Sequence, residues 1–192
     1  MAVYDNLAYR EELRHEIMNG EVLSMPPAAP LHNHIAGNIF LIFGSYLKGK
    51  KCVPFSDGTA VYFDEENRVI PDVMIVCDRS KIQSRYVYGP PDLLVEVLSP
   101  STAKNDRQYK KSIYESNGVP EYWIVSPREK SIEVYFLRDG HYILDNLYTY
   151  CSEEDQEDMT EAEKEALTTE FRCRLFDGLV IRLDDIFGGL FE

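Results

Sequence analysis

Two carboxylates lie in apolar, strand-like segments, where an acidic side chain is costly. The stretch "VIPDVMIVCD" (69–78) places Asp72 at the beginning of an expected strand over 69–76. A second expected strand, "DLLVEVLS" (92–99), contains Glu96 between two valines, and both faces of this strand are otherwise apolar. An isolated buried carboxylate is strongly unfavourable unless it is paired, protonated or bound to a metal. Asp72 and Glu96 are therefore candidates for a functional role.

Two such carboxylates favour the binding of a hard divalent cation. If their strands are neighbours in a sheet, Asp72 and Glu96 converge, and carboxylate oxygens with room for water suit Mg²⁺ or Mn²⁺. The backbone carbonyl of Val97 can complete the protein ligands. Two other interpretations stay open here: Asp72 as a turn or strand-end cap, and Glu96 as one half of a buried salt bridge.

A helix expected after this strand carries a third set of polar side chains. Pro100 marks its N-terminal boundary and Gly118 its end. Asp106, Lys110 and Tyr114 are spaced i, i+4, i+8 and form one ridge. If the ridge faces the sheet, Lys110 can reach the carboxylates. The alternative is an exposed Asp106–Lys110 pair worth a few tenths of a kcal/mol, with Tyr114 as a core aromatic.

The surrounding pattern predicts the elements that must position these residues. Asn19-Gly20 favours a type I′ turn, which predicts a β-hairpin over 14–25. Apolar residues at helical spacing predict a helix over 31–48, and further strands are expected at 52–55 and 59–63 and after residue 120. This order indicates an α+β domain with one mixed, curved β-sheet, flanking helices and an N-terminal β-hairpin. We expect a single domain over 1–192.

Charge and composition narrow the function classes. The chain is 44% hydrophobic with a net charge of −13, and residues 152–165 alone carry −7, leaving −6 elsewhere. Tight non-specific binding to nucleic acid is not expected without a cation bridging the phosphates. We expect 151–168 to be an acidic insertion, as an exposed loop or short helix. The apolar runs are too short to span a membrane.

The cysteines and the N-terminus suggest a location. Cys52, Cys77, Cys151 and Cys173 form no CxxC motif. We interpret them as reduced core thiols of a cytoplasmic protein. The first 16 residues carry acids early and no apolar core, so we expect no secretory signal.

The block from residue 71 to residue 127 resembles a known family. The matching pieces are Pro71-Asp72, Pro91-Asp92, "EVLSPST" (96–102), Asp106, Lys110, Tyr114, Gly118-Val119 and "EYW" (121–123). Together with the hairpin "HEIMNGEVLSM" and the following helix, they resemble the Uma2 family of restriction-endonuclease-like proteins, in the PD-(D/E)xK nuclease superfamily. The resemblance covers roughly residues 9–145 and implies a restriction-endonuclease-like fold.

The resemblance also implies roles for individual residues. Asp72 and Glu96 would be the metal-binding acids. The superfamily pattern requires a lysine two residues after the glutamate, where this chain has Leu98. In Uma2 proteins the lysine is expected from the following helix, which makes Lys110 the candidate. Glu16, His34 and Tyr114 are possible accessory residues. The respective alternatives are a solvated hairpin face, a satisfied histidine at a helix edge and a core aromatic.

The expected function is therefore Mg²⁺-dependent hydrolysis of DNA phosphodiester bonds by an endonuclease, which could act as a homodimer. A catalytically inactive nuclease-fold binding or regulatory module is the main alternative, favoured by Leu98 and the net charge of −13. A hydrolase acting on another phosphorylated or small substrate is a third possibility. It lacks support, since the chain has neither a Gly-rich phosphate loop nor a Gly-x-Ser-x-Gly elbow.

Overall fold

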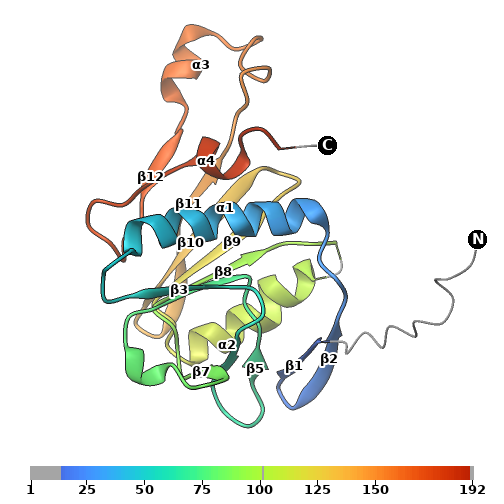
Figure 1. Cartoon of the computed structure of the whole chain (residues 1–192). Helices are drawn as coiled ribbons and strands as arrows, with labels where there is room; N and C mark the ends of the chain where they lie inside the picture. Colours follow the sequence, from blue (N-terminus) through green and yellow to red (C-terminus); the bar gives the residue numbers. More distant parts are fainter. Residues whose placement is uncertain (1–13, 101, 191–192) are drawn as a thin grey trace, which may run out of the picture.

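A computed structural model describes residues 14–100 and 102–190. Two mixed sheets and one long helix organise the molecule (Figure 1). The larger sheet has six strands in the order β11-β10-β9-β8-β6-β3, and the smaller has five in the order β2-β1-β5-β4-β7. The strands of a third, two-stranded sheet are β12 and β13. The α+β fold is confirmed, with the strands divided among three sheets where the sequence indicated one.

The bounds of the strands follow the chain. They are β1 Arg14–Met18, β2 Glu21–Met25, β3 Val53–Ser56, β4 Ala60–Tyr62, β5 Arg68–Val69, β6 Val73–Val76, β7 Tyr86–Tyr88, β8 Leu93–Val97, β9 Glu121–Ser126, β10 Ser131–Arg138, β11 His141–Thr149, β12 Glu170–Arg172 and β13 Val180–Arg182. The helices are α1 Pro30–Leu47, α2 Lys111–Ser116, α3 Glu161–Ala166 and α4 Leu183–Phe187. Arg79–Lys81 forms one 3₁₀ turn, and a π-helical segment over Asn105–Lys110 leads into α2.

The N-terminal hairpin and the first helix form where the sequence predicts them. Asn19 and Gly20 have φ values of 52° and 79°, the left-handed pair that a type I′ turn requires. The hairpin pairs antiparallel from Arg14↔Met25 to Met18↔Glu21. In α1, Pro30 occupies the first turn, where its missing N–H is not needed, and the buried side chains recur at helical spacing.

The six-stranded sheet separates two apolar clusters. One face packs against α1, α4 and β12, through residues such as Phe43, Trp123 and Phe171. The other face packs against α2 and the smaller sheet, through Tyr114 and Tyr122 among others. Figure 1 shows α1 crossing one side of the sheet with α2 on the other. Tyr114 and Trp123 are both fully buried, so the interpretation of Tyr114 as a core aromatic is confirmed.

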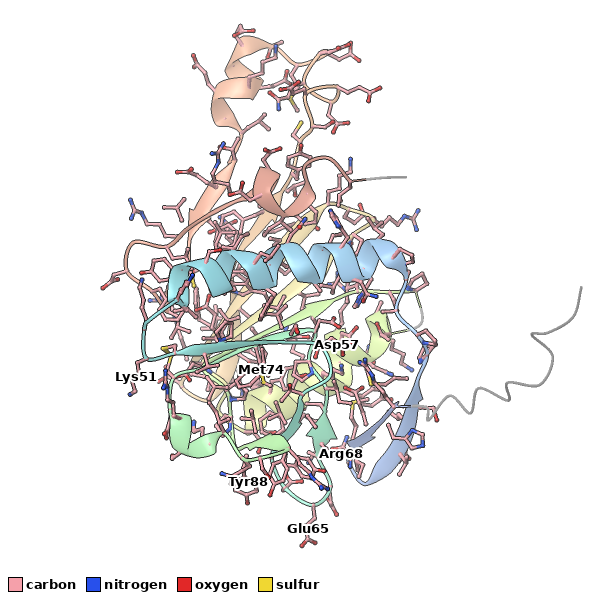
Figure 2. All side chains as sticks on the ribbon, in the orientation of Figure 1. Lys51, Asp57, Glu65, Arg68, Met74 and Tyr88 are labelled. Atoms are coloured by element: carbon pink, nitrogen blue, oxygen red, sulfur yellow. A yellow bond between two sulfur atoms is a disulfide. The ribbon has the colours of Figure 1, made fainter. Side chains whose placement is uncertain are left out.

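The expected strand over 69–76 is wrong as one element. The chain instead forms β5 in the smaller sheet and β6 in the larger one, with residues 70–72 between them. Pro71 lies at this transition and has no N–H to continue a strand ladder. Figure 2 labels Met74 of β6 inside the body and Glu65 at the tip of the turn that leads into β5. The break places Asp72 at the junction of the two sheets.

The acidic segment expected over 151–168 contains α3, an exposed helix that projects from the body (Figure 1). This helix begins with a capping box between Thr160 and Glu163.

The interpretation of all four cysteines as reduced thiols is wrong for two of them, since Cys52 and Cys77 form a disulfide. Strands β3 and β6 pair with Val53 opposite Val76, so the same register continued by one residue places Cys52 opposite Cys77. Cys151 and Cys173 are free.

Within residues 14–100 and 102–190, no helix has both the length and the apolar character needed to cross a bilayer.

Candidate active site

Strand pairing brings the two predicted carboxylates together. Strand β6 runs antiparallel to β8 with Val73 opposite Val95, so the same register continued by one residue places Asp72 opposite Glu96. The backbone N–H of Val97 donates a hydrogen bond of 2.7 Å to Oδ2 of Asp72. The exposed fractions of Asp72 and Glu96 are only 8% and 2%. The predicted convergence of these two acids is therefore present in the fold.

The helix after β8 supplies the lysine. Nζ of Lys110 lies 3.1 Å from Oε1 of Glu96, and the Tyr114 hydroxyl donates to the same oxygen over 2.5 Å. All three side chains on the predicted ridge, Asp106, Lys110 and Tyr114, are buried against the sheet. The π-helical turn over 105–110 lies where Lys110 reaches the strand. The alternative of an exposed Asp106–Lys110 pair is excluded by this burial.

Glu16 enters the same cluster from the N-terminal hairpin. Its side chain is 6% exposed, so a solvated hairpin face does not describe it. Oε1 of Glu16 lies 3.0 Å from Nζ of Lys110 and accepts a 2.8 Å hydrogen bond from the N–H of Ile70. The contact with Ile70 ties β1 to the break between β5 and β6, beside Asp72.

The cluster contains more acidic than basic side chains. Four buried carboxylates, those of Glu16, Asp72, Glu96 and Asp106, surround the single buried amine of Lys110. Burial would lower the pKa of Lys110, but Glu96, Glu16 and Asp106 together outweigh burial and raise that pKa well above its usual value. Burial also raises the pKa of Glu96 well above its usual value, because Lys110 compensates it only in part and three other acids lie near. The cluster thus holds more acids than bases, and burial disfavours the charged form of Glu96.

A histidine that the sequence interpretation passed over completes the site. Nε2 of His32, in the first turn of α1, lies 3.2 Å from Oδ2 of Asp72. Burial lowers the pKa of His32, but the hydrogen bond and charge of Asp72, together with the Val97 carbonyl, outweigh burial and raise it. The predicted His34 is exposed and lies off the buried stripe of α1. Helical spacing could have predicted that His32 faces the sheet, because His32 precedes the buried Ile35 and Ala36 by three and four residues.

The donor set suits a hard cation. Its side chains offer carboxylate oxygens and no thiol, the ligand type that Mg²⁺ prefers. Oδ1 of Asp106 is buried and makes no hydrogen bond, and burial raises the pKa of this carboxyl. Among the described residues, no three His, Cys, Asp or Glu side chains are arranged as a ready-made metal cage. A Mg²⁺ ion held by one or two carboxylates and several waters needs no such cage.

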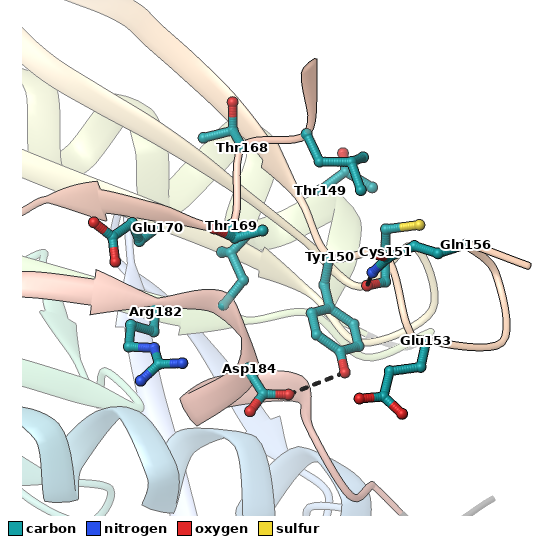
Figure 3. Close-up of a pocket in the computed structure, with 12 residues that line it drawn as sticks. Thr149, Tyr150, Cys151, Glu153, Gln156, Thr168, Thr169, Glu170, Arg182 and Asp184 are labelled. Atoms are coloured by element: carbon teal, nitrogen blue, oxygen red, sulfur yellow. Dashed lines mark hydrogen bonds between the residues drawn. The ribbon is translucent and has the colours of Figure 1, made fainter. Parts of the chain in front are cut away.

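A separate pocket at the base of the acidic segment contains none of these residues. It has a volume of about 420 Å³ and lies between the end of β11, the start of β12 and the start of α4. Figure 3 shows Tyr150 donating a hydrogen bond of 3.2 Å to Asp184 across it. Its lining mixes one arginine, Arg182, with several acids. The candidate site is instead the buried carboxylate–lysine cluster, where β1, β6, β8 and the helix meet.

Comparisons with known proteins agree with this fold. An uncharacterised protein of Synechocystis sp., slr1290, is 31% identical over 132 residues, which cover 68% of this chain and 70% of that protein. A crystal structure of a putative nuclease of the DUF820 group from Anabaena variabilis superposes with a TM-score of 0.63 at 16% identity, covering 92% of this chain and 90% of that one. At this identity the superposition supports the fold.

A family model places the chain more directly. The model of the family described as Uma2, putative restriction endonuclease, matches residues 2–172, which include every residue of the carboxylate–lysine cluster. The chain therefore belongs to the Uma2 family of restriction-endonuclease-like proteins.

Proposed function

We propose that this protein is a Mg²⁺-dependent endonuclease that hydrolyses phosphodiester bonds of DNA, with a site of the PD-(D/E)xK type. One observation carries the proposal: the amine of Lys110 lies 3.1 Å from Glu96, whose strand places it opposite Asp72. Two acids and a lysine are the set this chemistry needs, and here the lysine comes from a helix because Leu98 fills its usual strand position. Membership of the Uma2 family supports a nuclease-like activity.

Each residue of the cluster has a role in this proposal. Asp72 and Glu96 would hold the ion, with the Val97 carbonyl as a further ligand. A bound Mg²⁺ supplies a water of lowered pKa and neutralises charge at the phosphate. Lys110 stays protonated because its pKa is raised, so it stabilises negative charge that develops on the phosphoryl oxygens. Tyr114 fixes the orientation of Glu96 through its 2.5 Å hydrogen bond, and Glu16 and His32 hold Lys110 and Asp72.

The test is cleavage of supercoiled and linear DNA with Mg²⁺ or Mn²⁺. We expect nicking and linearisation by the wild type and a loss of at least about 100-fold in Asp72→Asn, since the variant keeps the shape and loses the charge. Asp139→Asn is the matched control, because Asp139 lies in an exposed turn at φ 51°, a conformation that asparagine tolerates. Wild-type protein without activity, or Asp72→Asn with full activity, would refute the proposal.

The inactive binding module remains the second candidate, on the strength of Leu98 and the net charge of −13. Titration calorimetry with Mn²⁺ separates the two. The nuclease proposal expects binding that Asp72→Asn and Glu96→Gln abolish. If the protein is an inactive module, the wild type and both variants should give the same small heat of binding.

A homodimer that cuts both strands stays a prediction, to be measured by light scattering with and without DNA.

A further inference from the structure

A second pocket lies on the opposite face of the six-stranded sheet from the carboxylate–lysine cluster. It has a volume of about 400 Å³ and is formed by the end of β10, the middle of β11 and the loop that joins β12 to β13. Phe136 and Cys173 in its lining belong to the apolar cluster under α1, whereas Tyr114 beside Glu96 belongs to the other cluster. A ligand here cannot touch Lys110 or Glu96.

Three arginines line this pocket without an ion pair. In the described part of the chain, no carboxylate oxygen lies within ion-pair distance of Arg138, Arg172 or Arg174, whereas Arg14 pairs with Asp57 and Arg107 pairs with Glu133. Two acids, Asp145 and Asp177, also line the pocket and leave it a net charge of +1. A concave positive site is unusual on a protein whose net charge is −13.

Arg138 and Arg172 are the last residues of β10 and β12, and Arg174 lies on a firmly anchored loop between β12 and β13. The guanidinium of Arg174 lies over the Phe136 ring, 4.6 Å from its centroid. The neighbouring N–H of Leu175 donates to the buried carboxyl of Glu121, which also accepts a 2.7 Å hydrogen bond from the Trp123 indole. The hydroxyl of Tyr46 in α1 donates over 3.1 Å to the backbone oxygen of Asp177.

Further contacts fix the two ends of the same loop. The N–H of Cys173 donates over 3.0 Å to the carbonyl of Leu179, which closes the loop on itself. The ring of Phe176 packs against Phe43 and Tyr46 of α1. The pocket is thus preorganised, so a ligand would not have to order the arginines' backbone on binding.

We propose that this pocket binds a small phosphate-bearing ligand of about the size of a nucleotide. Guanidinium groups present paired N–H donors that match phosphate oxygens, and several of them without an ion pair make a phosphate site. The volume lies in the range of small-molecule sites. The phosphate could belong to a free nucleotide or to the 5′ end of a nucleic-acid strand, and the site is independent of the proposed cleavage site.

Titration calorimetry with the intact protein at low salt tests whether the pocket binds a phosphate-bearing ligand. AMP is the probe, adenosine the ligand without the phosphate, and inorganic phosphate the competitor. We expect AMP to bind at least tenfold more tightly than adenosine and phosphate to compete with it. Arg172→Gln combined with Arg174→Gln should weaken AMP binding at least tenfold. Arg128→Gln, which removes one positive charge from an exposed turn outside the pocket, should leave the affinity within twofold.

Three results would overturn the assignment: no AMP binding at millimolar concentration, equal binding of adenosine and AMP, or equal losses in the pocket variant and in Arg128→Gln. Thermal unfolding checks that the pocket variant is folded, and Arg138→Gln provides a single substitution with an expected smaller loss. A dinucleotide with and without a 5′-phosphate identifies the source. If the 5′-phosphorylated form binds more tightly than AMP, the ligand is a strand end, and if AMP binds more tightly, it is a free nucleotide.

Discussion

At the scale of single residues, Lys110 is the cation on which the buried acids depend. Its amine lies 3.0 Å from Glu16, 3.1 Å from Glu96 and 3.6 Å from Asp106. Removing one partner of a buried ion pair is far more costly than the pair is worth, because the remaining charges stay desolvated. Lys110 is therefore both a catalytic candidate and a structural one.

We predict that Lys110→Met loses DNA cleavage by about 100-fold or more and unfolds more easily by about 3–5 kcal/mol. Mg²⁺ should raise the thermal midpoint of the variant more than that of the wild type, since the cation replaces the lost charge. The control is Lys104→Met, an exposed position at the start of the same helix. A variant as stable and as active as the wild type would show that Lys110 does not serve the cluster.

Glu121 gives a pH-dependent prediction at the same scale. Burial is the main cause that raises its pKa from 4.5 to about 7. Between these pH values the folded state keeps a proton that the unfolded state releases, so the stability that Glu121 contributes falls as pH rises from 4.5 to about 7. The shift corresponds to roughly 3 kcal/mol.

We expect Glu121→Gln to flatten this fall, because glutamine still accepts from Trp123 and does not ionise. Urea unfolding of both proteins at pH 5 and pH 8 measures it. The difference in unfolding free energy between these pH values should be smaller in the variant by about 2–3 kcal/mol. Identical pH profiles would mean that Glu121 ionises as easily in the folded protein as in the unfolded chain.

At the scale of elements, the disulfide joins β3 to β6 at the end of β6 opposite to Asp72, which directly precedes this strand. The two cysteines are separated by 25 residues along the chain. Closing a loop of this length restricts the unfolded chain and stabilises the fold by about 3 kcal/mol in the chain-entropy model. Disulfides of this kind are rare in reducing compartments. A bond between Cys52 and Cys77 in the cell would therefore count against the expected cytoplasmic location.

We predict that Cys52→Ser combined with Cys77→Ser lowers the free energy of unfolding by about 3 kcal/mol in non-reducing buffer. Peptide mapping by mass spectrometry should find the two cysteines cross-linked. Cys151→Ser, at a free and half-buried cysteine, should change stability little. Two free thiols at 52 and 77 in the purified protein would instead support the expectation of reduced cysteines.

At the scale of the whole molecule, the net negative charge of the protein repels the proposed substrate, DNA. The net charge is −13, and the segment 152–165 carries eight acids and one lysine. Exposed charges act on a polyanion over roughly one Debye length, about 10 Å at 0.1 M salt. Because α3 projects from the body, its acids can be changed without disturbing the core.

Replacing the eight acids of 152–165 by their amides should raise DNA affinity by about tenfold at low salt, and the gain should shrink as salt is added. The capping box survives, since glutamine can replace Glu163 at this position. Fluorescence anisotropy with a labelled duplex, over a series of salt concentrations, measures the effect. An unchanged affinity at low salt would show that the segment does not influence DNA binding.

Local pattern in the sequence determined much of this protein. A continuous run of apolar residues marked β8 and showed Glu96 as an acid in an apolar strand, and helical spacing predicted α1 and the ridge of Asp106, Lys110 and Tyr114. Asn19-Gly20 predicted the hairpin because its left-handed conformation depends on those two residues alone. These features depend on neighbours a few residues away, so they can be read without a structure.

Only the tertiary structure decided what meets at the site. Glu16 reaches Ile70 across 54 residues, and His32, not His34, contacts Asp72 through the way α1 lies on the sheet. The split of 69–76 into β5 and β6 and the pairing of Cys52 with Cys77 follow from strand register between distant segments. Register and packing are set by burial summed over the whole core, which no local window of sequence contains.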